Sequence, residues 1–282
     1  MCDAQLALAG GCCRGTPFVV VSAGEVGLSV VAAKLRRMSR GDLKNLPDGL
    51  PAGRLITPEG ADSPALWVSD EQLSDADVHW ARLYDIRRET GLYPLLLDGP
   101  SSDPINLWHD EELWPKAIAD IDALDAADVL AERWRELMRD DEEALSLAPA
   151  GTTDADADAV ARHMAEGLGE VDSWILGLVP ADRGADTLTV AGWAGPWNHI
   201  RTVEVSAVVR SWEERFGARV VAVGYDVLDL SVAAPPTTIE HARQVAAEHY
   251  AFCPDNIWQG IGDFEEYASS LVGAQRWQFW WD

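Results

Sequence analysis

The last six residues, "WQFWWD" (277–282), constrain the fold more than any other segment of this 282-residue chain. A strand over this segment would place three large aromatic side chains on one face, those of Trp277, Phe279 and Trp281. Burying one apolar side chain of this kind stabilises a fold by roughly 1.5–3 kcal/mol. The segment therefore predicts a terminal strand that packs against a substantial core.

Apolar periodicity predicts further strands and helices upstream of this strand. Short apolar runs bounded by turn residues predict strands over 54–57, 64–69, 92–98 and 174–180, followed by a hairpin over 218–232. Helical spacing of apolar residues predicts helices over 74–90, 110–147, 203–216, 235–252 and 263–272. This order predicts an α+β fold, in which helices pack on a mostly antiparallel sheet that a smaller α/β N-terminal region precedes.

One strand of the predicted hairpin alternates between apolar and polar residues, and its polar residues are Asp229 and Ser231. Such alternation is typical of a sheet that has one face on the core and the other face in water. We therefore expect the side chains of Asp229 and Ser231 to face solvent.

Changes in composition along the chain predict four segments. Residues 1–45 are expected to be a poorly ordered or overextended N-terminus, with Met38 as an alternative start. An N-terminal α/β region is expected over 46–148, and an acidic linker or helix over 149–172. A C-terminal domain is expected over 173–282.

The net charge of −25 limits the classes of partner that the chain can bind. A strongly acidic surface repels nucleic acids and anionic membranes, whereas it attracts a basic protein. The cysteines, at positions 2, 12, 13 and 253, lack the spacing of a disulfide framework or a zinc knuckle, which favours a reducing cytoplasm. No signal peptide, membrane span or cofactor is predicted, because the sequence has no matching motif.

The segment "AEHYAFCPD" (247–255) contains a candidate catalytic group. On a helix, His249 and Cys253 would lie on one face, where a thiolate and an imidazole could act together and Asp255 could orient the ring. However, Pro254 disfavours helical geometry at Cys253, and an apolar neighbourhood is typical of an inert core cysteine. A zinc site would need two distant ligands such as His199 and Asp282, so no metal site is predicted.

A second candidate is the loop "GWAGPWNHI" (192–200), which contains two tryptophans, an amide and a histidine. Loops that display aromatic and amide side chains are typical binding surfaces, although both indoles could instead pack beneath the loop. The candidate binding residues of this loop and of the later segment 255–258 are Trp193, Trp197, Asn198, His199, Asp255, Asn256 and Trp258.

Four motifs carry a resemblance to a known family: "GWAGPWNHI", "VVRSWEERFGARVVAVGYDVLDLSVAAPP", "AAEHYAFCPDNIWQG" and "WQFWWD". With them, residues 174–282 resemble the bacterial domain-of-unknown-function 4253 family, which is common in actinobacteria. The upstream motifs "LPAGRLITPEG", "PALWVSD" and "TGLYPLLLDG" look like the N-terminal companion region of such proteins. The resemblance implies no activity, so it assigns no catalytic residue.

Two hypotheses for function follow from these observations. The first is a non-catalytic, acidic module that binds a basic protein, as an immunity protein or an antitoxin does. The alternative is a hydrolase that uses His249, Cys253 and Asp255. A deep polar pocket that joins these residues would favour the hydrolase, whereas an enclosed Cys253 would favour the binding module.

Overall fold

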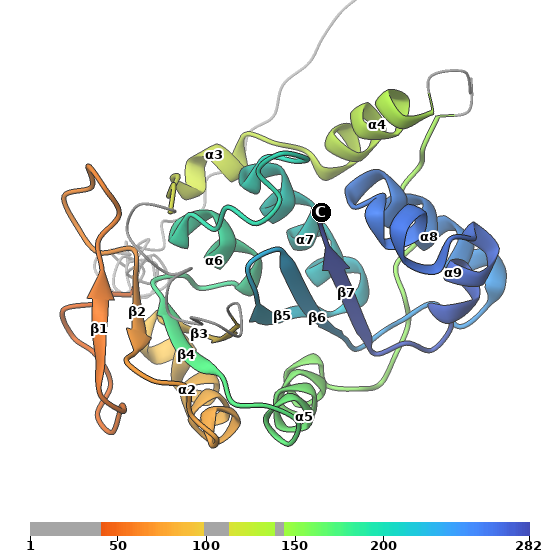
Figure 1. Cartoon of the computed structure of the whole chain (residues 1–282). Coiled ribbons are helices and arrows are strands. Elements are labelled where there is room, and N and C mark those ends of the chain that lie inside the picture. Colours follow the sequence, from red (N-terminus) through yellow and green to blue (C-terminus); the bar gives the residue numbers. More distant parts are fainter. Residues whose placement is uncertain (1–40, 99–112, 139–143) are drawn as a thin grey trace, which may run out of the picture. The chain divides into compact units, whose positions relative to one another are not determined.

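A seven-stranded sheet organises the residues that the computed structural model describes, 41–98, 113–138 and 144–282 (Figure 1). The sheet has the strand order β1-β2-β4-β3-β5-β6-β7, and only β3 and β5 pair in parallel. The strands are β1 (Gly53–Ile56), β2 (Leu66–Ser69), β3 (Tyr93–Leu97), β4 (Ile175–Val179), β5 (Ala218–Val223), β6 (Val227–Val232) and β7 (Arg276–Trp280). This mixture of helices with a mostly antiparallel, open sheet confirms the predicted α+β class.

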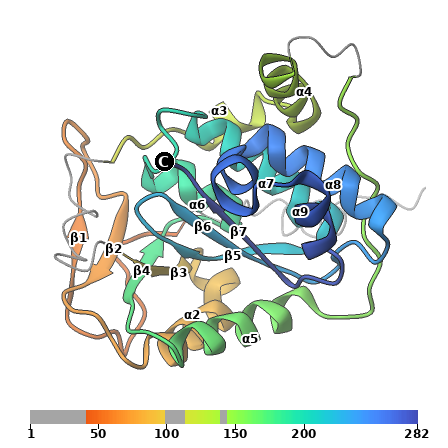
Figure 2. The ribbon, with the colours of Figure 1, turned by 45° about the vertical axis from the view of Figure 1, so that its right-hand side comes forward.

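Helices cover both faces of the sheet (Figure 2). Helix α2 packs on β3 and α5 packs on β5 and β6, whereas α6 and α7 pack on β5 from the other side and α8 packs on β7. The helices are α2 (Ala76–Thr90), α3 (Ile118–Asp122), α4 (Ala126–Leu137), α5 (Ala157–Gly169), α6 (Gly184–Ala191), α7 (Thr202–Phe216), α8 (Ile239–Phe252), the π-helix η3 (Asn256–Ile261) and α9 (Phe264–Ser270). No helix among the described residues is both long and apolar enough to cross a membrane.

Strand β4 lies between β2 and β3, although it follows both of them by more than seventy residues in the sequence. Gly177 of β4 is in register with Val68 on one side and with Leu95 on the other. Strands of the predicted regions 46–148 and 173–282 therefore share one sheet. The physical reason is that β4 is buried along its whole length and needs a neighbouring strand at each edge.

The structure gives the helices in more detail than the sequence predicts. The predicted helix over 110–147 is two helices, α3 and α4, and the side chain of Asp125 caps the second by accepting bonds from the amides of Ala127 and Asp128. The acidic segment 149–172 contains α5, and the sequence reasoning missed α6 and η3. Residues 1–40, 99–112 and 139–143 lie outside the described residues, as does most of the predicted segment 1–45.

The expectation that Asp229 and Ser231 face solvent is wrong. Both side chains are buried, because α5 lies over the face of β6 to which they belong. The opposite face of β6 carries Leu228 and Leu230 and is buried as well. The sheet is therefore covered on both faces at β6. The alternation of apolar and polar residues along this strand reflects an apolar interior on one face and a polar interior on the other.

Helix α5 is fixed in place by Asp158, which four side chains from other elements bind, the most exposed of them Arg88 of α2 at 3.4 Å. Arg87 of α2 donates a hydrogen bond of 2.5 Å to the carboxylate, the hydroxyl of Tyr84 donates one of 3.0 Å, and Arg219 of β5 donates one of 3.2 Å. Burial alone would raise the pKa of Asp158, but these bonds, with that from Arg87 first, lower it to about 2. The ionised carboxylate therefore links α5 to α2 and to the sheet.

We predict that Asp158→Asn lowers the free energy of unfolding by about 2 kcal/mol at neutral pH, because an amide oxygen is a weaker acceptor for arginine. A depressed carboxyl pKa stabilises the fold above the unfolded-state pKa, and this contribution is lost as the pH falls. The difference between the two proteins should therefore shrink between about pH 4 and pH 2. Urea unfolding at several pH values measures it, with Asp154→Asn at an exposed carboxyl as control. An equal effect of both variants would contradict the prediction.

Candidate functional site

The segment 247–260 runs from the end of α8 into η3 and faces the terminal strand β7. Cys253 is the residue at which α8 ends, and its backbone amide still donates to the carbonyl of His249. His249 and Cys253 are both buried completely. The sequence therefore brings the two candidate catalytic residues together, but inside the core.

His249 lies among aromatic rings. Its ring centre is 4.5 Å from that of Trp277 and 4.8 Å from that of Phe279. Burial, together with the positive charge of Arg215, lowers the pKa of His249 to about 3. The imidazole is therefore neutral near pH 7, and its Nε2 atom has no hydrogen-bond partner among the described residues.

The thiol of Cys253 is bound to the backbone of β7. Its Sγ atom donates to the carbonyl oxygen of Trp280 at 2.9 Å and lies 3.4 Å from Oδ1 of Asn256. Burial raises the pKa of Cys253 to about 12. Because the thiolate is the nucleophilic form, a thiol with so high a pKa is unreactive near pH 7.

Asn256 is the centre of this polar cluster. Its Nδ2 atom donates to the carbonyl oxygen of Gln278 at 2.6 Å, and its Oδ1 atom accepts from the amide of Trp280 at 3.2 Å. Strand β7 pairs with β6 alone and is an edge of the sheet. The Asn256 amide therefore satisfies the edge of β7 at the place where a further strand would pair.

The same asparagine is connected to His249 through the hydroxyl of Tyr267. Nδ2 of Asn256 also donates to the hydroxyl of Tyr267 at 3.2 Å, and that hydroxyl lies 3.0 Å from Nδ1 of His249. Because an amide nitrogen only donates, the hydroxyl accepts from Asn256, and its contact with Nδ1 continues the chain of hydrogen bonds to the imidazole. Asn256, Tyr267 and His249 therefore form one buried polar chain.

Asp255 turns toward the C-terminus of the chain. Its Oδ2 atom accepts from the amide of Asp282 at 3.3 Å and lies 3.8 Å from Nδ1 of His199. Nε2 of His199 is 2.9 Å from the carbonyl oxygen of Asp282. His199 and Asp255 thus both bind the backbone of Asp282, the last residue. The ring of His249 instead contacts the hydroxyl of Tyr267 through Nδ1. No group of three or more metal-binding side chains occurs among the residues described by the structure.

The two tryptophans of the loop 192–200 have opposite environments. Trp193 is buried, and its Nε1 atom donates to the carbonyl oxygen of Gly224 at 2.8 Å. Trp197 is 62% exposed and contacts Trp114, which is 56% exposed, edge to face at a centroid distance of 6.5 Å. Asn198 beside it is also exposed.

The two exposed indoles border a hollow of about 700 Å³ between the segment that precedes α3 and the start of α7. Its other polar lining residues include Lys116, Asp120 and Arg201. Sequence reasoning missed Trp114, because the residue fell inside a predicted helix and its partner lies 83 positions further along the chain. We call Trp114 and Trp197 the tryptophan pair.

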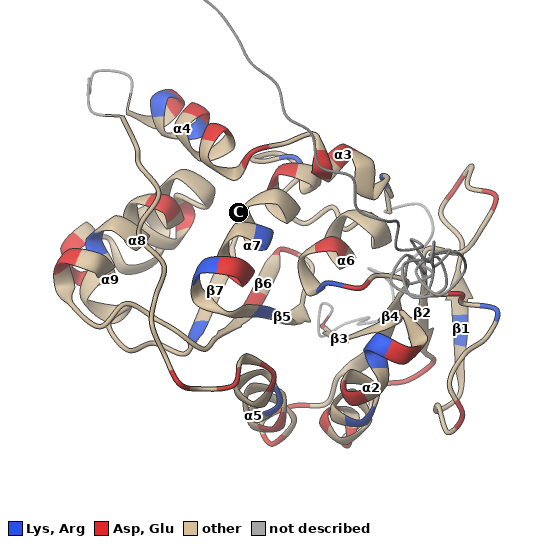
Figure 3. Ribbon diagram, turned by 180° about the vertical axis from the view of Figure 1, so that it is seen from behind, with Lys and Arg blue, Asp and Glu red and all other residues tan. Residues whose placement is uncertain are grey.

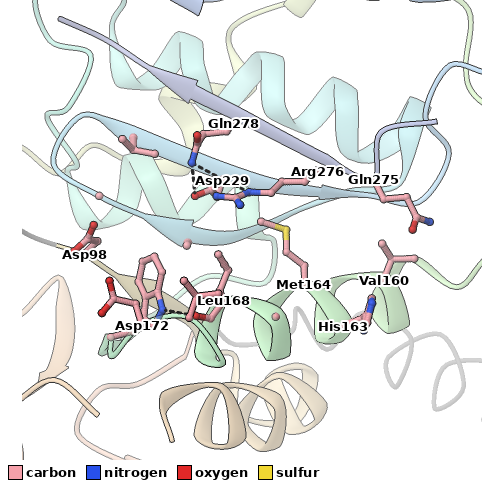
Figure 4. A pocket seen from close by; sticks show the side chains of 16 residues that line it. Asp98, Val160, His163, Met164, Leu168, Asp172, Asp229, Gln275, Arg276 and Gln278 are labelled. Atoms are coloured by element: carbon pink, nitrogen blue, oxygen red, sulfur yellow. Dashed lines mark hydrogen bonds and ion pairs between the residues drawn. The ribbon is translucent and has the colours of Figure 1, made fainter. Parts of the chain in front are cut away.

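Trp258, the remaining tryptophan candidate, lies apart from this hollow. It is 60% exposed on η3 and packs edge to face on Tyr250 of α8 at a centroid distance of 5.5 Å. A second hollow, of about 640 Å³, lies between α5 and strands β5 to β7, and none of the predicted site residues lines it (Figure 4).

Part of the chain matches a known protein family. Residues 175–282 match the model of the family described as "Domain of unknown function (DUF4253)", which confirms the resemblance for this part of the chain. The match begins at the first residue of β4. Comparison with curated proteins gives no match, and comparison with solved structures gives none either.

We predict that Asn256→Ala lowers the free energy of unfolding by about 2–4 kcal/mol. The substitution removes bonds to Gln278, Trp280 and Tyr267, and it leaves the first two groups unsatisfied at a partly buried edge. Denaturant unfolding measures the change, and Asn198→Ala at an exposed asparagine is the matched control. Equal stabilities of the two variants would show that the amide does not hold β7.

We also predict that Cys253 resists thiol-reactive reagents in the folded protein. A variant in which Cys2, Cys12 and Cys13 are replaced by serine leaves this thiol alone, and those three residues lie outside the described structure. Labelling at mildly alkaline pH should be slow, because the thiol is buried and protonated, and should become fast in urea. Fast labelling of the folded protein would instead indicate a reactive thiolate.

Proposed function

We propose that this chain, whose residues 175–282 belong to the DUF4253 family, is a non-catalytic module that binds a basic protein through the tryptophan pair. The observation that carries the proposal is the mutual contact of two tryptophans that each leave more than half of their surface exposed. We place its action in the reducing cytoplasm, where it would hold a partner as an immunity protein or an antitoxin does.

The chemistry of tryptophan supports this surface as the binding site. Tryptophan is the residue type most enriched among interface hot spots, and its truncation commonly costs about 2 kcal/mol or more of binding free energy. Trp114 and Trp197 come from separate segments and border one hollow. A partner side chain that enters the hollow would cover both indoles at once.

The charge of the protein supports a basic partner. Acidic residues outnumber basic ones along α3 and α4, the two helices that follow Trp114 (Figure 3). Two cations, Lys116 and Arg201, line the hollow together with Asp120, and Arg201 is paired with Glu204. A net charge of −25 would accelerate encounter with a cationic protein, and the aromatic contacts would then slow its release.

The burial of the catalytic candidates weighs against the hydrolase alternative. A hydrolase must bring substrate and water to its nucleophile, but His249 and Cys253 are completely buried and border none of the hollows described above. Their pKa values also keep the imidazole neutral and the thiol protonated. The properties of His249 and Cys253 are those of buried structural residues.

We predict that Trp197→Ala raises the dissociation constant for the partner by about 30-fold, mainly through faster dissociation. The partner is first isolated by affinity capture at low salt, and the kinetics are then measured with the purified pair. Trp258→Ala, which removes an equally exposed indole at another place, is the matched control. Higher salt should slow association of both variants.

Two outcomes would contradict the proposed binding function. If no partner is captured at low salt and the protein hydrolyses an ester or phosphate in a way that His249→Ala abolishes, the binding module is excluded and the hydrolase is correct. If Trp197→Ala and Trp258→Ala weaken binding equally, the tryptophan pair is not the site.

A further inference from the structure

The cleft between α5 and the sheet has two walls of unlike polarity (Figure 4). The wall on α5 is mostly apolar and includes Met164 and Leu168. The floor on the sheet is polar and includes Asp229, Arg276 and Gln278. A polar surface and an apolar surface do not satisfy each other by packing, so the cleft is suited to a ligand that has one part of each kind.

The floor is preorganised around Asp229. This side chain is only 5% exposed, and its Oδ1 atom accepts from Nε of Arg276 at 2.8 Å and from Nε2 of Gln278 at 3.2 Å. The charge of Arg276 balances that of Asp229. Asp98 and Asp172 also line the cleft and lie at one end of it in Figure 4, and the carboxylate of Asp172 is exposed there.

Gly167 of α5 lines the cleft, and a Cβ atom added there would meet no atom within 4 Å. A larger side chain at this position would therefore occupy part of the cleft without a clash at its Cβ atom. A glycine in a helix is less stable than an alanine, so the substitution should not weaken the helix.

An aromatic side chain completes the lining beside the acidic end. Trp174 lines the cleft, and its Nε1 atom donates to the carbonyl oxygen of Leu168 at 3.2 Å, which fixes the indole relative to α5. Indole faces attract organic cations, and carboxylates nearby add to this attraction. We propose that the cleft binds a small organic cation, an amine or a guanidinium carried on an apolar or aromatic body.

The proposal is tested with two ligands of similar shape and opposite charge, 2-phenylethylamine and 3-phenylpropionate, by calorimetric titration of the full-length chain. The amine should bind saturably and the carboxylate should not. Gly167→Leu fills the cleft without displacing any atom near its Cβ, so it should weaken amine binding at least tenfold while the melting temperature is retained or raised. Asp172→Asn should weaken amine binding several-fold.

Matched controls separate this site from the rest of the molecule. Ala159→Leu adds the same side chain at an exposed position of α5 that does not line the cleft, and it should leave amine binding unchanged. Trp197→Ala should also leave it unchanged, so failure of the protein-binding surface would not affect the result. The proposal is overturned if the amine fails to saturate at millimolar concentration, if the carboxylate binds as well, or if Gly167→Leu binds the amine like the unmodified chain.

Discussion

The bond between the Asn256 amide and the edge of β7 is the constraint on which the C-terminal part of the structure depends. An edge strand exposes unpaired backbone groups, and β7 must also keep its aromatic face on the core. Asn256 satisfies the edge, the thiol of Cys253 binds the next carbonyl, and Tyr267 joins the amide to His249. A segment with the residue types of a catalytic site therefore covers the edge of a sheet.

The two faces of the sheet differ in how tightly they are packed. The face toward α7 and α8 is an aromatic interior, in which Trp212 stacks on Phe279 at a centroid distance of 5.2 Å. The face toward α5 is polar, and the ionised Asp158 holds the helix over it without filling the space beneath. The aromatic packing on the face toward α7 and α8 already fixes the strands. The face toward α5 can therefore keep an open cleft.

The sequence was sufficient for most elements and insufficient for the sites. Gly91 ends α2 in a left-handed conformation, with φ of 67°, as its position predicts, and β7 follows from its alternation. The fate of Asp229 could not be predicted, because it depends on whether α5 covers that face. Trp193 and Trp197 occupy one loop, yet the carbonyl that binds Trp193 lies 31 residues further along the chain. Local patterns determine local structure, but burial depends on contacts that are distant in sequence.

The position of β4 also determines how the chain can fold. Its neighbours β2 and β3 come earlier in the sequence and are synthesised first. The position between them in the sheet belongs to β4, residues 175–179. Closing a loop of this length before any pairing is gained slows the search for the native state. Folding during synthesis must therefore wait for β4, and until then the inner edge of β2 and both edges of β3 are unpaired and open to chaperones or to other chains.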